Sequence, residues 1–327
     1  MVSRRAMMCG LGIAAMGRSL AALSQTNVKA KIGWLAVGPI TTSKRVFLEA
    51  LKQRGYAEGV NLVLEERYPR NIEQYPELVA ELIRLKVDVL VTTGGAASRA
   101  AKAATTSVPI VFLTTDPMGA GLITSLARPK DNLSGVAIIT QDFNAKRVET
   151  ITAMVPGITT VAALGDASGA LNTATQQAFF EETEAAAKRL GTQVTRRMEI
   201  RKIDEVEAAF GAAVKSGAGA MLTISSSYFN VHKARLVSAA ARTRLPTIYE
   251  HRDFVEAGGL VSYGPDLRYG YEVAASYVDK ILKGAKPTDL PVEQVSKVEL
   301  VINMRTAASL NLAVPPPLLL RADELVR

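Results

Sequence analysis

The chain has 327 residues, of which 48% are hydrophobic, 21% charged and only 6% aromatic, a balance that is typical of a folded globular protein and excludes a disordered one. A single core has usually stopped growing at this length, so we expect two lobes of roughly 100–200 residues each. The net charge of +8 reflects 39 Lys and Arg against 31 Asp and Glu. Because no block of like charges concentrates it, nucleic acid is not indicated as a partner.

Scarce cysteine and histidine exclude several kinds of chemistry. Cys9 is the only cysteine, and His232 and His251 are the only histidines. A mature chain that has lost its first residues would hold no disulfide, no thiolate nucleophile and no Cys-ligated metal centre. Two histidines cannot form a three-His site, so we expect neither a metal nor a cofactor.

The N-terminus has the pattern of an export signal. Arg4 and Arg5 precede an apolar stretch of small residues at positions 6–17, and the Ala-Leu-Ser at positions 22–24 fits the rule for cleavage. The stretch is shorter than the roughly 20 apolar residues of a membrane span. We therefore expect residues 1–24 to be removed and the mature protein to be periplasmic. The Sec route and the twin-arginine route both remain open.

From residue 31 onward, short β-branched runs alternate with helical patterns, which is typical of a parallel α/β sheet. The spacing of Val46, Phe47, Ala50 and Leu51, for example, is that of a helix packed on one face. In the first half of the chain, strands are predicted at residues 31–37, 61–68, 88–93, 108–113 and 133–139.

The same alternation begins again in the second half. Strands are expected at residues 159–164, 193–200, 218–224, 247–250 and 260–263, and helices at residues 170–190, 203–216, 230–244 and 267–283. After them come an extended run at 295–302, a short helical stretch at 304–310 and a three-proline tail at 315–317. Two successive sets of βα units predict an α/β protein with two doubly wound, Rossmann-like lobes joined by a hinge.

Loops at the carboxyl ends of parallel strands form the ligand crevice of such sheets, so two facing lobes predict a cleft. Most of these loops are hydroxyl-rich and suit hydrogen bonding better than proton transfer. In the turn Thr93-Gly94-Gly95, glycines between a strand and a helix expose backbone N–H groups, and the helix N-terminus stabilises an anion. Asp116-Pro117 either accepts a bond from a ligand ammonium or caps a helix.

The sequence lacks the motifs of several enzyme classes: a G-x-S-x-G elbow, a Walker loop and a complete dinucleotide fingerprint. Glu250 beside His251 at a strand end leaves an exported α/β enzyme open as an alternative, with His251 as general base. The other interpretation of His251 is a surface histidine in a polar loop. We expect His232 to be a solvated helix residue.

Several segments, spread in order over nearly the whole mature chain, share the pattern of one family. They include LKQRGYAEG at 51–59, TTGGAASRAAKAAT at 92–105, SLARP at 125–129, NLSGV at 132–136, GGLVSYG at 258–264 and ELVIN at 299–303. Through them the chain resembles the exported substrate-binding proteins of ABC transporters, in the branch with the type I periplasmic-binding fold that includes tryptophan and other aromatic amino acid binders.

The resemblance implies a cleft that closes on a small organic solute, an amino acid or a related carboxylate, with residues 93–97 gripping an anionic group and Asp116 near its other end. It also implies a monomer that delivers the solute to the permease subunits of an ABC importer. The crossing segments are expected near residues 139–142, 262–265 and 290–298, which leaves 25–139 and 265–290 in one lobe and 140–264 and 291–327 in the other.

Ligand contacts are expected from both lobes. The loops and the resemblance together assign Pro39, Thr41, Thr93, Gly94, Gly95, Ala96, Ala97, Thr115, Asp116, Pro117, Ser168, Ser226, Tyr228, Glu250 and Tyr263. Where relatives often carry an Asn-Pro-rich loop, this chain has Gly-Asp-Ala-Ser-Gly-Ala at 165–170, with Asn172 the nearest asparagine. A repressor-like effector-sensing core is a further alternative, although the first thirty residues offer an apolar signal and not a helix-turn-helix.

Overall fold

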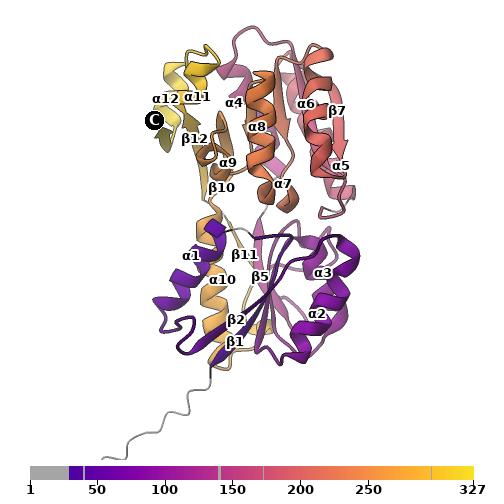
Figure 1. Ribbon diagram of the computed structural model, residues 1–327, viewed down its shortest axis with the longest axis vertical. Helices are drawn as coiled ribbons and strands as arrows, with labels where there is room; N and C mark the ends of the chain where they lie inside the picture. Colours follow the sequence, from indigo (N-terminus) through magenta and orange to yellow (C-terminus); the bar gives the residue numbers. More distant parts are fainter. Residues whose placement is uncertain (1–28, 40, 139–140, 172, 296) are drawn as a thin grey trace, which may run out of the picture.

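The computed structural model describes residues 29–39, 41–138, 141–171, 173–295 and 297–327, so the expected export signal at residues 1–24 and Asn172 lie outside the described residues. The described chain forms two lobes, one above the other in Figure 1, and each lobe is built on its own sheet. The first sheet contains, in spatial order, β11 (Glu293–Gln294), β5 (Leu133–Ile138), β4 (Ile110–Thr115), β3 (Val89–Thr93), β1 (Ala30–Leu35) and β2 (Leu62–Arg67).

The second sheet has the same general plan. In spatial order it contains β13 (Glu324–Val326), β12 (Val298–Asn303), β10 (Val261–Pro265), β9 (Thr247–Tyr249), β8 (Ala220–Thr223), β6 (Thr160–Asp166) and β7 (Gln193–Ile200). The strands of both sheets pair parallel, except that β10 and β12 run antiparallel. Central strands such as β3 and β8 are buried along their whole length, which is why the sequence shows them as continuous apolar runs.

Helices cover both faces of the first sheet. One face is covered by α1 (Thr41–Lys52) and α10 (Leu267–Leu282), and the other by α2 (Tyr75–Arg84) and α3 (Gly95–Ala104). Trp34 of β1 joins α1 to α10, because its ring lies 5.1 Å from that of Phe47 and 6.1 Å from that of Tyr271, centroid to centroid.

The second sheet is covered in the same way. One layer contains α4 (Gln141–Met154), α5 (Thr173–Arg189), α11 (Met304–Ser309) and α12 (Pro316–Arg321), and the other contains α6 (Val206–Lys215), α8 (Lys233–Thr243) and α9 (Arg252–Glu256). Shorter elements are η1 (Ile72–Gln74), η2 (Ile203–Glu205), η3 (Pro287–Asp289) and α7 (Ser227–Val231). Two sheets, each between two layers of helices, confirm the expected doubly wound α/β fold.

Within the described elements, the chain changes from one lobe to the other three times, from β5 to α4, from β10 to α10, and from β11 to β12. The third passage comes later than the boundary expected after residue 290. Its position follows from backbone pairing, because Glu293 and Gln294 pair with Val136 and Ala137 of β5 and so belong to the first sheet. Within the described residues, no helix is long and apolar enough to span a membrane.

The structure differs from the sequence prediction in several short elements. The helix expected at residues 230–244 is in fact α7 and α8, which meet at His232, and Ser226 caps α7 by accepting a hydrogen bond from Tyr228 N at 3.0 Å. The five-residue α9 and the three-residue β13 were not predicted. Such elements are shorter than the window over which hydrophobic periodicity is visible.

Candidate functional site

A cavity of about 50 Å³ lies between the lobes, where strands of both sheets end; we call it the inner pocket. The first lobe contributes the loops that follow β3 and β4, together with the start of α10. The second lobe contributes the loops that follow β6, β8 and β9. Its described lining residues are Thr93, Gly94, Gly95, Leu113, Thr114, Thr115, Ile138, Leu267 and Tyr271 from the first lobe, and Ala170, Leu171, Ser225, Ser226, Ser227, Asn230 and His251 from the second.

The turn between β3 and α3 forms the polar part of the first-lobe wall. Gly94 takes a φ of +89°, which side-chain-bearing residues rarely adopt, before α3 begins at Gly95. The first N–H groups of α3 have no acceptor within the helix, and the helix dipole adds partial positive charge. Nη1 of Arg99 is buried without a hydrogen-bond partner among the described residues, 3.3 Å from the position that a Cβ on Gly95 would take. These groups together suit a carboxylate or a phosphate.

A loop of three serines forms part of the opposite wall. The hydroxyl of Ser226 donates a hydrogen bond to the buried carboxylate of Asp166, and Ser168 N donates to the same carboxylate at 2.8 Å. Burial raises the pKa of Asp166, against the opposing effect of these two hydrogen bonds. The carboxylate therefore fixes the position of the serine loop and does not itself line the inner pocket.

Asn230 and His251 complete the second-lobe wall. Oδ1 of Asn230 and Nδ1 of His251 are buried and have no hydrogen-bond partner within the described part of the chain. Burial, and after it the positive charge of Arg147, lowers the pKa of His251 to about 3, so its imidazole is neutral near pH 7. The interpretation of His251 as a surface histidine is wrong, since the residue is buried at the bottom of the cleft.

The two lobes touch across the cleft, so the structure is a closed one. A Cβ on Gly94 would lie 2.7 Å from Oγ of Ser227 in the opposite lobe. Farther out, Oγ1 of Thr175, in the first turn of α5, donates a hydrogen bond of 2.9 Å to Oδ2 of Asp116. Asp116 is thus a link between the lobes, and its other oxygen accepts a bond of 2.8 Å from Gly119 N.

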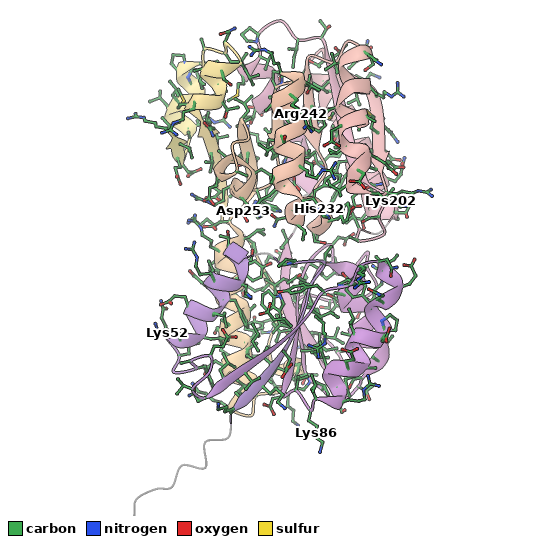
Figure 2. The ribbon with its side chains drawn as sticks, viewed as in Figure 1. Lys52, Lys86, Lys202, His232, Arg242 and Asp253 are labelled. Atoms are coloured by element: carbon green, nitrogen blue, oxygen red, sulfur yellow. The ribbon has the colours of Figure 1, made fainter. Side chains whose placement is uncertain are left out.

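A larger cavity of about 500 Å³, which we call the outer chamber, lies beside the inner pocket and shares Ala170 with it. Figure 2 places His232 and Lys202 at the end of the second lobe that faces the first. His232 is half-buried there, and its ring lies 4.6 Å from that of Tyr228, so the expected solvated helix position is wrong. The described lining residues are Val37, Gly38, Pro39, Tyr68, Pro69, Arg70, Asn71, Ile72, Glu73, Tyr75, Ser168, Ala170, Arg201, Lys202, Tyr228, Val231 and His232.

The residues expected to contact a ligand fall into three groups. Those that line the inner pocket are Thr93, Gly94, Gly95, Thr115 and Ser226. Those that line the outer chamber are Pro39, Ser168 and Tyr228. Those that the structure places in neither lining are Ala96, Ala97, Asp116, Pro117, Glu250 and Tyr263, while the side chain of Thr41 lies outside the described part of the structure.

Packing explains several members of the third group. Ala96 and Ala97 belong to the core beneath α3, where they are buried and do not reach the cleft. Tyr263 lies at the passage from β10 to α10, where its ring meets that of Phe143 edge-on and its carbonyl accepts a bond of 2.7 Å from Nε of Arg147. The structure thus places Tyr263 at the hinge between the lobes and not in the lining of either cavity.

Glu250 is fully buried and lines neither cavity. Its Oε2 accepts a hydrogen bond of 2.7 Å from Oγ1 of Thr223. Burial raises the pKa of Glu250 to about 7, against the opposing effect of the Arg147 charge. Glu250 and His251 therefore do not face one cavity together, as the enzyme alternative requires.

Sequence reasoning missed several residues of the inner pocket. Ser225 and Ser227 were in a loop that was expected at the cleft, and Asn230 follows that loop by one helical turn. Four polar residues at positions 225–228 follow the buried strand β8, and this run could have indicated Ser225 and Ser227. Tyr271 gave no such signal, because it reaches the pocket from a helix 178 positions after Thr93 in the sequence.

Comparison with known proteins places these features in a family. The model of the family described as ABC transporter substrate-binding protein matches residues 40–326. A curated protein of Clostridioides difficile (strain R20291), the tyrosine-binding protein, is 26% identical over 276 residues, which is 83% of this chain and 76% of that protein.

Two solved structures share the fold. The ABC domain from Streptococcus pneumonia in complex with L-Trp has a TM-score of 0.81 at 25% identity, covering 91% of this chain and all of that one. A conserved domain protein from Vibrio cholerae O1 biovar eltor strain N16961 has a TM-score of 0.81 at 24% identity, covering 91% of this chain and 99% of that one. Because the family match extends over almost the whole described chain, the protein belongs to the ABC transporter substrate-binding proteins.

Proposed function

We propose that the protein captures a small organic solute that carries a carboxylate, an amino acid or a related acid, and delivers it to the permease subunits of an ABC importer. The observation that carries the proposal is the inner pocket, in which an anion-binding turn on one lobe faces unpaired polar atoms of Asn230 and His251 on the other. The tyrosine-binding protein and the tryptophan complex among the relatives support an amino acid as the first candidate.

Closure of the cleft is the mechanism of capture. Only the closed arrangement lets one solute touch both walls of the inner pocket, so the solute binds that form more tightly and shifts the population toward it. The solute leaves chemically unchanged, as expected of a binding protein and not of an enzyme. The N-terminal pattern supports export to the periplasm, where a monomer would meet its permease.

Isothermal titration of the mature protein against amino acids and small carboxylates tests this function. We expect at least one to bind, and small-angle scattering to show a smaller radius of gyration with that solute present. A folded, ligand-free preparation that binds no member of the library would contradict the proposal. Recovery of a chemically altered solute would favour the enzyme alternative.

Removal of the hydrogen bond between Thr175 and Asp116 is expected to weaken solute binding by roughly three- to tenfold. The bond joins the lobes and exists only when they are closed, and a net hydrogen bond contributes about 0.5–1.5 kcal/mol. Thr175→Val keeps the shape of the side chain and removes the hydroxyl, and titration calorimetry measures the affinity.

The matched control is Thr152→Val, since the Thr152 hydroxyl donates to Val148 O at 2.8 Å within its own helix. We expect that variant to bind the solute as the unmodified protein does. Equal affinity in both variants would show that the bond between the lobes does not contribute to closure.

A further inference from the structure

The outer chamber carries an excess of positive charge at its mouth. Arg70, Arg201 and Lys202 are exposed there, whereas Glu73 is the only carboxylate among the described residues that line the chamber. None of the three cationic side chains forms an ion pair with a carboxylate of the described residues. These three charges are therefore available to an anion that enters from solvent.

The cations come from equivalent loops of the two lobes. Arg70 lies between β2 and η1, and Arg201 lies between β7 and η2. Each loop is held by the same bond: Arg70 N donates to Oε1 of Gln74 at 2.7 Å, and Arg201 N donates to Oε2 of Glu205 at 2.9 Å. The backbone N–H groups make these bonds, so the guanidinium groups of Arg70 and Arg201 take no part in them and remain exposed.

Closure brings the two loops to one cavity. Ile72, next to the first loop, approaches the second lobe so closely that a Cβ on Gly169 would lie 2.6 Å from its Cδ1. Like charges on the two rims then repel each other, and the repulsion grows as the rims approach. An anion bound between them removes this repulsion and gains most in the closed form, so it favours closure.

The walls of the outer chamber suit a flat apolar body. Tyr68, Tyr75, Tyr228 and His232 line it. The hydroxyl of Tyr68 donates a hydrogen bond to Glu66, and the hydroxyl of Tyr228 accepts one from Ile203 N at 2.8 Å. Both hydroxyl groups therefore have hydrogen-bond partners within their own lobes. The half-buried rings of Tyr68, Tyr228 and His232 are surfaces for packing against an aromatic ring, whereas Tyr75 is only 2% exposed.

We propose that the solute carries a second acidic group on an aromatic body, and that Arg70, Arg201 and Lys202 bind this group in the outer chamber. The inner pocket holds the first carboxylate, and the outer chamber lies next to it, since Ala170 lines both cavities. The inference rests on the proposed function and narrows its substrate class from amino acids and related carboxylates to diacids with an aromatic ring.

Two probes that differ only in the second acid test the inference. Titration calorimetry at low salt compares L-phenylalanine with para-carboxy-L-phenylalanine on the mature protein. We expect the second probe to bind at least about tenfold more tightly, because bonds between ionised groups are the strong ones. The double variant Arg201→Gln/Lys202→Gln is expected to reduce that preference to about threefold or less, and Arg70→Gln to reduce it in part.

The matched controls are Arg84→Gln and Lys215→Gln, exposed cations in the last turns of α2 and α6, the helices that follow the two loops. Combined in one protein, these two substitutions lower the net charge by the same amount as Arg201→Gln/Lys202→Gln. We expect this control to keep the full preference for para-carboxy-L-phenylalanine. Three outcomes overturn the inference and leave the proposed function standing. They are equal affinity for the two probes, tighter binding of phenylalanine, and binding of neither probe by a protein that binds another amino acid. Failure to bind any solute of the library overturns the function and the inference with it.

Discussion

Gly94→Ala is expected to weaken solute binding by roughly tenfold to a hundredfold, since overpacking costs about 1–3 kcal/mol. The alanine Cβ would lie 2.7 Å from Oγ of Ser227 in the opposite lobe, so the closed form has to open or displace that side chain. The variant also loses stability by about 1–2 kcal/mol, because an L-residue is strained at the left-handed φ of +89° in the open and the closed form alike. Calorimetry measures the first effect and denaturant unfolding the second.

The two effects of Gly94→Ala separate in a double variant. Adding Ser227→Ala removes the clashing oxygen and leaves Cβ of residue 227 at 3.4 Å, an ordinary contact. We expect solute affinity to recover while the loss of stability remains. Gly191→Ala is the matched control, with a φ of +71° and nothing within 4 Å of its Cβ position. It should lose stability and keep its affinity, and a Gly94→Ala protein with unchanged affinity would argue against closure at this turn.

Most of the architecture could be predicted from the sequence, because buried parallel strands have continuous runs of apolar residues. β3, expected at residues 88–93, spans Val89–Thr93, and β7 spans Gln193–Ile200 as expected. Prediction failed where the pairing between strands, and not the local sequence, decides which sheet a segment joins. Nothing local distinguishes Glu293 and Gln294, which join the first sheet, from the strand after them, which runs antiparallel to β10 in the second.

The site was predictable at the level of loops and not of side chains. The rule that ligands bind at strand ends found the turn at Gly94 and the serine loop, since it depends only on the order of elements. Which side chains face the cavity depends on helix rotation and on contacts between the lobes. Ala97 was therefore assigned to the ligand although it packs in the core, and the pairing of Asp116 with Thr175, 59 positions apart, was not predicted.

Arg147→Met is expected to lower the free energy of unfolding by about 1–3 kcal/mol, because it removes two buried hydrogen bonds and the charge that opposes the effect of burial on Glu250. Arg147 is fully buried in α4, where Nε donates to Tyr263 O at 2.7 Å and Nη1 donates to Oδ1 of Asn144 at 2.8 Å. Its charge also opposes the effect of burial on Glu250. Denaturant unfolding measures the loss, and we expect the double variant Arg147→Met/Glu250→Gln to recover part of it. A double variant no more stable than Arg147→Met would show that the charge of Glu250 is not the cause.

The pH dependence of stability provides an independent test of Glu250. Burial raises its pKa to about 7 in the folded protein, from 4.5 in the unfolded chain, so the folded state binds the proton more tightly. The resulting stabilisation is complete below pH 4.5 and is lost as the pH rises through 7. Glu250→Gln cannot titrate, so the free energy of unfolding of the unmodified protein should fall relative to this variant by up to about 3 kcal/mol over that window. Glu58→Gln, which removes an exposed carboxylate, is the control, and parallel curves for Glu250→Gln and the unmodified protein would mean that folding does not raise the pKa of Glu250.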